Sequence, residues 1–263
     1  MTIVILGGMA LVLATLERLA HLRFRPARLL RAGFASDTVY LLTGYVAGGS
    51  LAIAYVVAGS DVMIRLGMPR LARTALSPWI VTPLALVALD LGNYVAHWLL
   101  HRVDVLWEFH KVHHSSPSLD WLATFRSHLV EQALRRLLAP VVLIAAGVPT
   151  DAVVTAAVAF QAWAMLNHAN LRVPLAFLEP VLVTPRLHRL HHVPRTTERN
   201  LGTVLTCWDR LRGTLVVDDA PVDAPLGIPG DQASYPQGWM RQLVEPFRRT
   251  AAASRTRPQT STI

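Results

Sequence analysis

The chain has 263 residues, of which 52% are hydrophobic and only 16% are charged, and its mean hydropathy is +0.37. Soluble proteins average roughly 25% charged residues, so the composition favours a membrane protein over the alternative, a soluble helical enzyme with a large core. The net charge of +8 does not indicate a nucleic-acid partner, because no binding module or grouping of basic residues with aromatics is recognisable. The single cysteine, Cys207, excludes an intrachain disulfide.

Two apolar runs open the chain. Residues 2–20 are apolar until Glu17 and Arg18. A cleaved signal peptide is the alternative, but no basic region precedes this run and HLRFRPARLLR follows it in place of a small-residue cleavage site. Residues 38–60 carry no charge, and about 20 apolar residues suffice to cross a bilayer. We therefore expect two membrane helices here.

A third run starts near Pro78 and contains Asp90. An ionisable residue at membrane depth is costly, so it indicates a functional site. The spacing of Asp90, Tyr94, His97 and His101 is 4, 3 and 4, which places all four on one face of a continuing helix. This polar face is expected to lead into a histidine cluster.

Residues 134–166 are apolar apart from three charged residues and are interrupted by Gly147–Thr150, which predicts a hairpin of two short helices at about 134–167. Such a hairpin returns the chain to the same face, so that His168 can join the earlier histidines. The expected organisation is N-terminal membrane helices in 1–75, a catalytic region in 76–218, and a polar C-terminal tail in 219–263 that is disordered at its end.

The positions of the arginines predict the orientation in the membrane. The number of membrane crossings places the loop 21–37 and the histidines on the same face of the membrane. The arginines beside the apolar runs would contact membrane lipids. That face carries Arg23, Arg25, Arg28, Arg31, Arg102, Arg126 and Arg186, and the opposite loop carries Arg65, Arg70 and Arg73. The positive-inside rule then places the histidines on the cytoplasmic side.

The histidines form three groups at helical spacing, in HWLLHRVDVLWEFHKVHH (97–114) and HRLHH (188–192). Apolar residues separate them, which excludes a purification tag. Because HxxxH and HxxHH place imidazoles on one helix face, and zinc takes about four ligands, eight histidines favour two metals. Imidazole suits iron, zinc, copper and nickel alike; iron at a bilayer surface can activate dioxygen, whereas zinc has no redox chemistry.

The chain resembles the fatty acid hydroxylase and sterol desaturase superfamily of membrane non-haem di-iron enzymes. The similarity lies in Asp90, YVAHWLLHRVDVLWEFHKVHHSS (94–116), FRSHLVE (125–131), LNHANL (166–171), TPRLHRLHHVP (184–194) and NLGTVLTCWDRLRGT (200–214). It covers roughly half of the chain, and the order of the histidine groups makes it specific. The resemblance implies an all-α integral membrane bundle with a cytoplasmic histidine-rich cap that holds two iron ions.

The resemblance also implies the metal ligands. They are His97, His101, His110, His113, His114, His168, His188, His191 and His192. His128 matches a family position in RxHPxE, although Leu129 replaces the proline, and it is assigned near the site; Leu201 replaces the aromatic residue of the family's NYG. His21 matches no motif and is expected at the membrane interface.

Ligating imidazoles usually need an outer partner that fixes the orientation of the ring. Four polar residues near the ligands are candidates for this role: Asp90, Asn170, Asn200 and Asp209. The ordinary alternatives are a turn residue for Asn200 and an ion pair with Arg210 or Arg212 for Asp209. Of the four, we expect Asp90 and Asn170 to orient the imidazole rings.

The implied activity is the O2-dependent hydroxylation of a C–H bond in a lipid-like substrate. We expect the hydrocarbon part of the substrate to lie along the third apolar run and the hairpin. The substrate is a sterol, fatty acyl chain, carotenoid or ether lipid. No haem-binding HPGG occurs, so the resemblance implies a separate electron-transfer protein. The alternatives are desaturation on the same scaffold, a non-enzymatic metal binder or transporter, and a zinc hydrolase, although no HExxH is present.

Overall fold

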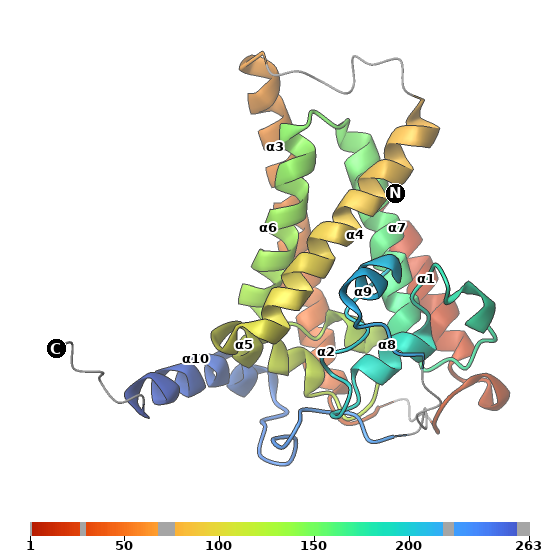
Figure 1. The fold of residues 1–263 in the computed structure, drawn as a ribbon, viewed down its shortest axis with the longest axis vertical. Helices are drawn as coiled ribbons and strands as arrows, with labels where there is room; N and C mark the ends of the chain where they lie inside the picture. Colours follow the sequence, from red (N-terminus) through yellow and green to blue (C-terminus); the bar gives the residue numbers. More distant parts are fainter. Residues whose placement is uncertain (1, 27–29, 68–76, 218–223, 257–263) are drawn as a thin grey trace.

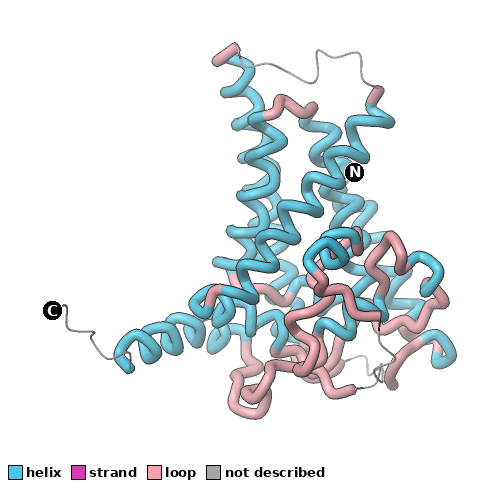
Figure 2. The backbone as a smooth tube through the Cα atoms, viewed as in Figure 1, coloured by secondary structure: helices cyan, strands magenta, loops and turns pink. Residues whose placement is uncertain are grey.

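A computed structural model describes residues 2–26, 30–67, 77–217 and 224–256, and this part of the chain is built of helices and loops (Figure 2). Only two isolated β-bridges, Arg23 with Leu171 and Leu182 with Leu205, occur among these residues, and no strand does. The prediction of an all-α fold is confirmed.

The elements follow one another as helices of very different length. They are α1 (Thr2–Leu16), η1 (Ala20–Leu22), α2 (Phe34–Tyr40), η2 (Leu41–Ala47), α3 (Gly48–Arg65), α4 (Pro78–Arg102), α5 (Asp104–His114), η4 (Trp121–Phe125), α6 (Leu129–Ala145), α7 (Thr150–His168), η5 (Ala176–Leu178), α8 (Pro185–His191), α9 (Cys207–Arg212) and α10 (Trp239–Thr256). Helices α3, α4, α6 and α7 form a tall bundle, and α5, α8 and α9 lie towards one end of it (Figure 1).

Two helices are long and apolar enough to cross a membrane. The elements α2, η2 and α3 make one continuous helix, Phe34–Arg65, of 32 residues, and α4 has 25 residues. Many of their apolar side chains point outwards: Leu51 is 72% exposed and Leu84 is 59% exposed. An apolar surface of this kind is stable against lipid rather than water, so the fold is that of an integral membrane protein.

Helix α1 is shorter than the membrane helix expected over residues 2–20. It has 15 residues, fewer than the about 20 that a span needs. The reason lies in Glu17, whose buried carboxylate accepts hydrogen bonds from the backbone N–H of Trp121 (3.0 Å) and of Asn170 (2.8 Å). The chain turns into the protein at Glu17 because this carboxylate joins α1 to η4 and to the end of α7.

Helices α6 and α7 lie on either side of the expected break. Gly147 has a positive φ of 68°, which a glycine adopts without strain, and Pro149 stands directly before α7. Small and branched side chains such as Ala85, Leu143 and Ala156 fill the core between these helices and α4. The hairpin returns the chain to the end of the bundle that carries α5, which places His168 at that end.

The histidine helices begin and end at local signals. Helix α4 starts at Pro78, where the Ser77 side chain accepts the N–H of Trp79, and it ends before Val103, whose extended backbone allows α5 to start at Asp104 in a new direction. Helix α8 starts at Pro185, with Thr184 as its cap. The turn at Val103 and the start of α8 at Pro185 bring the end of α4, the helix α5 and the helix α8 to one end of the bundle.

Segment 20–26, with its arginines, lies at the same end of the bundle as the histidine helices, and the end of α3 that carries Arg65 lies at the other (Figure 1). Arg28, Arg70 and Arg73, which entered the topology argument, are outside the described residues. The expected polar tail contains a helix that the sequence analysis did not foresee, α10. Residues 257–263, expected to be disordered, are outside the described residues too.

Candidate metal centre

The predicted ligands form two compact groups of imidazoles. The five-histidine group consists of His97, His101, His110, His114 and His191, and the four-histidine group consists of His113, His168, His188 and His192. Within each group the candidate ligand nitrogens all lie within 4.8 Å of one another. All nine histidines named from the sequence are therefore brought together, in two separate sets.

Each HxxHH motif contributes to both groups. His110 and His114 of α5 belong to the five-histidine group, whereas His113 belongs to the four-histidine group. Residues i and i+4 share a helix face, while neighbours such as His113 and His114 point about 100° apart. The sequence analysis expected all three imidazoles of a motif on one broad face, and the structure instead divides them between two centres.

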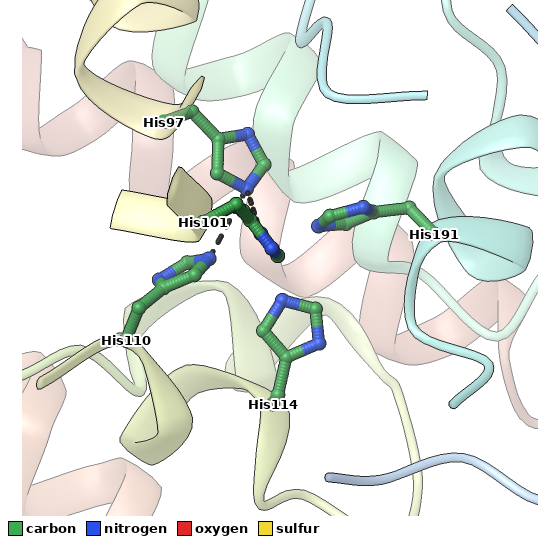
Figure 3. Close-up of side chains that lie close together, drawn as sticks. All are labelled: His97, His101, His110, His114 and His191. Carbon is green, nitrogen blue, oxygen red and sulfur yellow. Dashed lines mark hydrogen bonds between the residues drawn. The ribbon is translucent and has the colours of Figure 1, made fainter. Parts of the chain in front are cut away.

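The imidazole nitrogens converge at both centres. In the five-histidine group, His97 Nε2 lies 3.1 Å from His110 Nε2 and 3.2 Å from His101 Nε2, and His114 and His191 complete the ring (Figure 3). In the four-histidine group, His168 Nε2 lies 3.2 Å from His113 Nε2 and 3.1 Å from His188 Nε2. Nitrogens gathered in this way from three helical segments are the arrangement that a metal ion requires.

The imidazoles of the cap helices are held in the neutral form. Burial first, and then the charge of neighbouring histidines, lowers the pKa of His110, His113, His114, His188 and His192. The positive charge of Arg135 adds to this effect at His110, His113 and His188. Burial likewise lowers the pKa of His191 to about 3. A neutral imidazole has a free lone pair at pH 7, so these side chains are ready to bind a cation.

Several buried ring nitrogens have no hydrogen-bond partner among the described residues. They include Nε2 of His114 and of His191, in the five-histidine group. Buried polar atoms are almost always satisfied in proteins, so unpartnered nitrogens that face one another fit a metal. The donor set is all imidazole, which suits iron, and the residues present fit two metal ions.

Four of the nine imidazole rings donate their Nδ1–H to a backbone carbonyl. The pairs are His97 with Leu201 (2.7 Å), His113 with Arg126 (2.9 Å), His168 with Ala164 (2.9 Å) and His191 with Arg199 (2.9 Å). Such a bond fixes the tautomer and leaves Nε2 free for the metal. The outer partners of these rings are thus mostly backbone atoms, and sequence reasoning looked only among side chains.

Glu131 is an outer partner that sequence reasoning missed. Its Oε1 lies 3.0 Å from His110 Nδ1 and 3.0 Å from Arg135 Nε, and its side chain is almost completely buried. Arg135 in turn donates to Asn93 Oδ1 at 2.7 Å. The sequence feature that could have indicated Glu131 is its position in FRSHLVE (125–131), three residues after His128 and at the start of α6.

Asp90 does not contact an imidazole directly, contrary to the expectation. Its carboxylate accepts the backbone N–H groups of Val204 (2.9 Å) and Leu205 (3.0 Å) and the indole N–H of Trp208 (2.8 Å). These three donors lie just beyond Leu201, the residue whose carbonyl orients His97. Asp90 therefore anchors the loop after the last HxxHH to the middle of α4.

Asp90→Asn should unfold at lower temperature, because an amide cannot accept three N–H groups and its own NH2 would face a donor. The loss of a satisfied buried acceptor is expected to cost about 1–3 kcal/mol. Thermal unfolding and metal content of the purified variant would test this, with Asp61→Asn, an exposed residue paired with Arg65, as control. Equal stability of the two variants would contradict the anchoring role.

Asp209 and Asn200 also act on this loop rather than on a ring. The Asp209 carboxylate accepts the N–H of Leu201 (3.0 Å) and of Gly202 (2.7 Å), and it is not an ion pair with either neighbouring arginine. Asn200 has a positive φ of 54° and donates its side-chain amide to the carbonyls of Leu187 and Val216. Both residues hold Leu201 against His97.

Asn170 and His128 lie outside the two histidine groups. Asn170 exchanges hydrogen bonds with the backbone of Arg25, so it attaches the segment after α1 to the end of α7. His128 caps α6 by accepting the N–H of Val130 at its Nδ1, and its Nε2–H donates to the carbonyl of Leu243 in α10. Neither contacts a ligand by these bonds.

A largely apolar cavity leads to both histidine groups. Its volume is about 690 Å³, and α1, the long helix Phe34–Arg65, α4, α6 and α7 line it. His97 of one group and His113, His168 and His188 of the other form part of its wall. Trp121 is also part of this wall, whereas Trp107 packs on His101 and His114.

Comparison with known proteins agrees with this geometry. A family model described as "Fatty acid hydroxylase" matches residues 82–214, which is half of the chain and contains all nine histidines. The chain belongs to the fatty acid hydroxylase family. This family consists of non-haem iron enzymes, and the two histidine groups of this member offer places for metal.

Relatives of this fatty acid hydroxylase family member include lipid-modifying enzymes. It is 35% identical to the ornithine lipid hydroxylase OlsE of Rhizobium tropici over 63% of the chain and 50% of that protein. It is 30% identical to the alkylglycerol monooxygenase of Danio rerio and 27% identical to that of Homo sapiens, over 53% and 56% of the chain and 31% and 33% of those proteins. The aligned region thus spans at most half of the length of these relatives. No solved structure matches the chain significantly.

Proposed function

We propose that this protein is a di-iron oxygenase that hydroxylates a C–H bond of a lipid-like substrate with O2. The observation that carries the proposal is the apolar cavity between membrane helices, whose inner wall includes His113 and His168 of one histidine group and His97 of the other. A hydrocarbon chain that enters from the bilayer would lie with one carbon beside both metal centres. Aqueous metal binders have no need of such a cavity.

Two irons bound to the nine histidines would supply the activation of dioxygen and the electron-transfer steps. In the overall reaction one oxygen atom enters the C–H bond and the other leaves as water, with two electrons and two protons from a donor. The chain's own residues do the rest: Glu131, and the carbonyls of Leu201 and Arg126, orient the imidazoles. Apolar residues such as Leu6 and Phe160 hold the substrate chain and exclude water.

The relatives support hydroxylation rather than desaturation. Both the ornithine lipid hydroxylase and the alkylglycerol monooxygenases carry in their names the transfer of oxygen to a lipid. We accordingly propose a membrane lipid with a long alkyl or acyl chain as substrate, with an ether or acyl lipid favoured over a sterol. Desaturation of the same chain is the second candidate, because it needs the same oxidant and the same cavity.

The electron donor of this reaction would be a separate protein on the cytoplasmic side. The arginines of segment 20–26 and those near the histidines lie at one end of the bundle, and the positive-inside rule favours the cytoplasm for that end. His101 is the most exposed of the nine histidine residues. It therefore offers the shortest approach for electrons from the aqueous side.

The direct test uses the full chain in lipid nanodiscs, loaded with Fe²⁺ under anaerobic conditions and then given O2, a chemical reductant and a defined alkylglycerol or acyl lipid. Two irons per chain and a product that carries one ¹⁸O atom from ¹⁸O2 are expected. A product with a new double bond and no ¹⁸O would establish desaturation. A protein that retains only zinc and consumes no O2 would contradict the proposed function.

Gly7→Phe should shorten the chain length that the enzyme accepts. Gly7 lines the cavity, and a Cβ added there meets nothing within 4 Å, so a new side chain can start there without a clash and extend into the cavity. Gly8 is equally open but is not part of the cavity wall. Turnover of a long-chain substrate should fall about 10-fold or more in Gly7→Phe, while Gly8→Phe should retain the original chain-length profile. Equal profiles would remove the cavity as the substrate site.

A further inference from the structure

Helix α10 presents an apolar stripe that is more than half exposed. Met240, Val244 and Phe247 are 68%, 53% and 52% exposed. Their spacing of 4 and 3 places them on one face of the helix. Amphipathic helices of water-soluble proteins normally turn this face towards the core, so the exposed stripe of α10 requires another explanation.

The opposite face of α10 is polar and attached to the protein. Arg249 pairs with Asp231 in the loop that precedes the helix, and with Glu245 at 2.8 Å. Gln242 is fully buried and donates to Ser115 Oγ at 3.0 Å. The polar side chains thus fix how α10 is rotated about its own axis, and this rotation turns the apolar stripe away from the loop that contains Asp231.

Phe247 connects the stripe to the base of the membrane bundle. The Phe247 ring packs against Phe109, with centroids 5.0 Å apart, and against His128 at 5.6 Å. His128 is the cap from which α6 rises into the bundle, and its Nε2–H donates to the carbonyl of Leu243. Figure 1 shows α10 running outwards from the base of the bundle, at a steep angle to α6.

Two arginines flank the stripe. Arg241 and Arg248 are exposed, and the contact between Arg248 and the Glu245 carboxylate is long at 3.8 Å. An exposed apolar stripe with arginines at its edge is the pattern of a helix that lies in the interface of a bilayer. Basic residues at this depth attract anionic lipid headgroups.

We infer that α10 lies in the headgroup layer of an anionic bilayer, with Met240, Val244 and Phe247 at the boundary of the acyl chains and with Arg241 and Arg248 at the lipid phosphates. The membrane surface is thereby placed at the level of His128, where α6 begins. Through Gln242 and Ser115, which caps α5 directly after His114, the seated helix also supports the end of α5 that carries metal ligands. The inference is independent of the reaction proposed above.

The test measures the depth of single spin labels by their collisions with O2, which concentrates in lipid, and with a water-soluble nickel complex. The full chain with Cys207→Ser is placed in nanodiscs of phosphatidylcholine and phosphatidylglycerol. Val244→Cys carries the label on the stripe, and Ala233→Cys, an exposed position in the preceding loop, carries the control label. The label at position 244 should favour O2, and the label at position 233 should favour the nickel complex.

The arginines are tested on the Val244→Cys background. Arg241→Gln with Arg248→Gln should reduce the population of the seated helix about 5-fold for each arginine removed, and nanodiscs of phosphatidylcholine alone should do the same to the unchanged chain. A label at position 244 that meets the nickel complex as freely as position 233 would overturn the inference. Shielding from both reagents would also overturn it, since that result indicates a protein partner or a second copy of the chain.

Discussion

Alanine at His113 should abolish hydroxylation and release one metal ion, leaving the other in place. His113 belongs to the four-histidine group, so its removal leaves three imidazoles there and all five in the other group. Alanine at His191 should release the metal ion of the five-histidine group and leave the ion of the four-histidine group in place. Activity is expected to be lost in both variants because dioxygen chemistry at a pair of irons needs both ions.

Metal analysis by mass spectrometry, together with product analysis in nanodiscs, measures both effects in the same preparations. The matched control is His21→Ala, because His21 is an exposed histidine in η1 outside both groups. Membrane insertion should be unchanged in all three variants. Turnover retained by His113→Ala or His191→Ala would remove that residue from the site, and loss of both metals from one variant would show that the two centres do not bind independently.

Glutamine at Glu131 is expected to weaken metal binding about 10- to 100-fold, the usual effect of removing an outer partner of a ligating histidine. The Glu131 carboxylate lies 3.0 Å from His110 Nδ1 and also pairs with Arg135. Breaking a buried ion pair from one side costs about 3–5 kcal/mol, because the remaining charge stays uncompensated. In the variant, the uncompensated charge of Arg135 would repel the metal ion. In the unchanged protein, Glu131 neutralises that charge and helps to hold the metal ion through His110.

Titration of the metal-free protein with Co²⁺, followed by its visible absorption, measures this affinity without relying on turnover. Glu198→Gln is the control, because Glu198 is 61% exposed in its pair with Arg102. The double variant Glu131→Gln with Arg135→Gln should recover part of the affinity, since it removes the uncompensated charge. An unchanged affinity in Glu131→Gln would assign the carboxylate to the fold of α6 alone.

The resemblance to a known family supplied His168, whereas the sequence alone was sufficient for the other eight histidines, the two long spans, the hairpin break and the helical class of the fold. These features depend on local rules: the spacing of side chains on a helix, the length of an apolar run, and the effect of Gly147 and Pro149 on a helix end. It overestimated α1, because the role of Glu17 depends on Trp121 and Asn170, which are more than a hundred residues away.

Only the tertiary structure showed how the nine histidines divide into two groups and which contacts orient their rings. His113 and His114 are neighbours in the chain but belong to different centres, because the other members of each group arrive from α4, α7 and α8. Asp90 proved to anchor a loop rather than a ring, and Glu131 proved to be the carboxylate beside an imidazole, since both contacts join distant segments. Helical periodicity determines the face on which a residue lies, and only packing determines what that face meets.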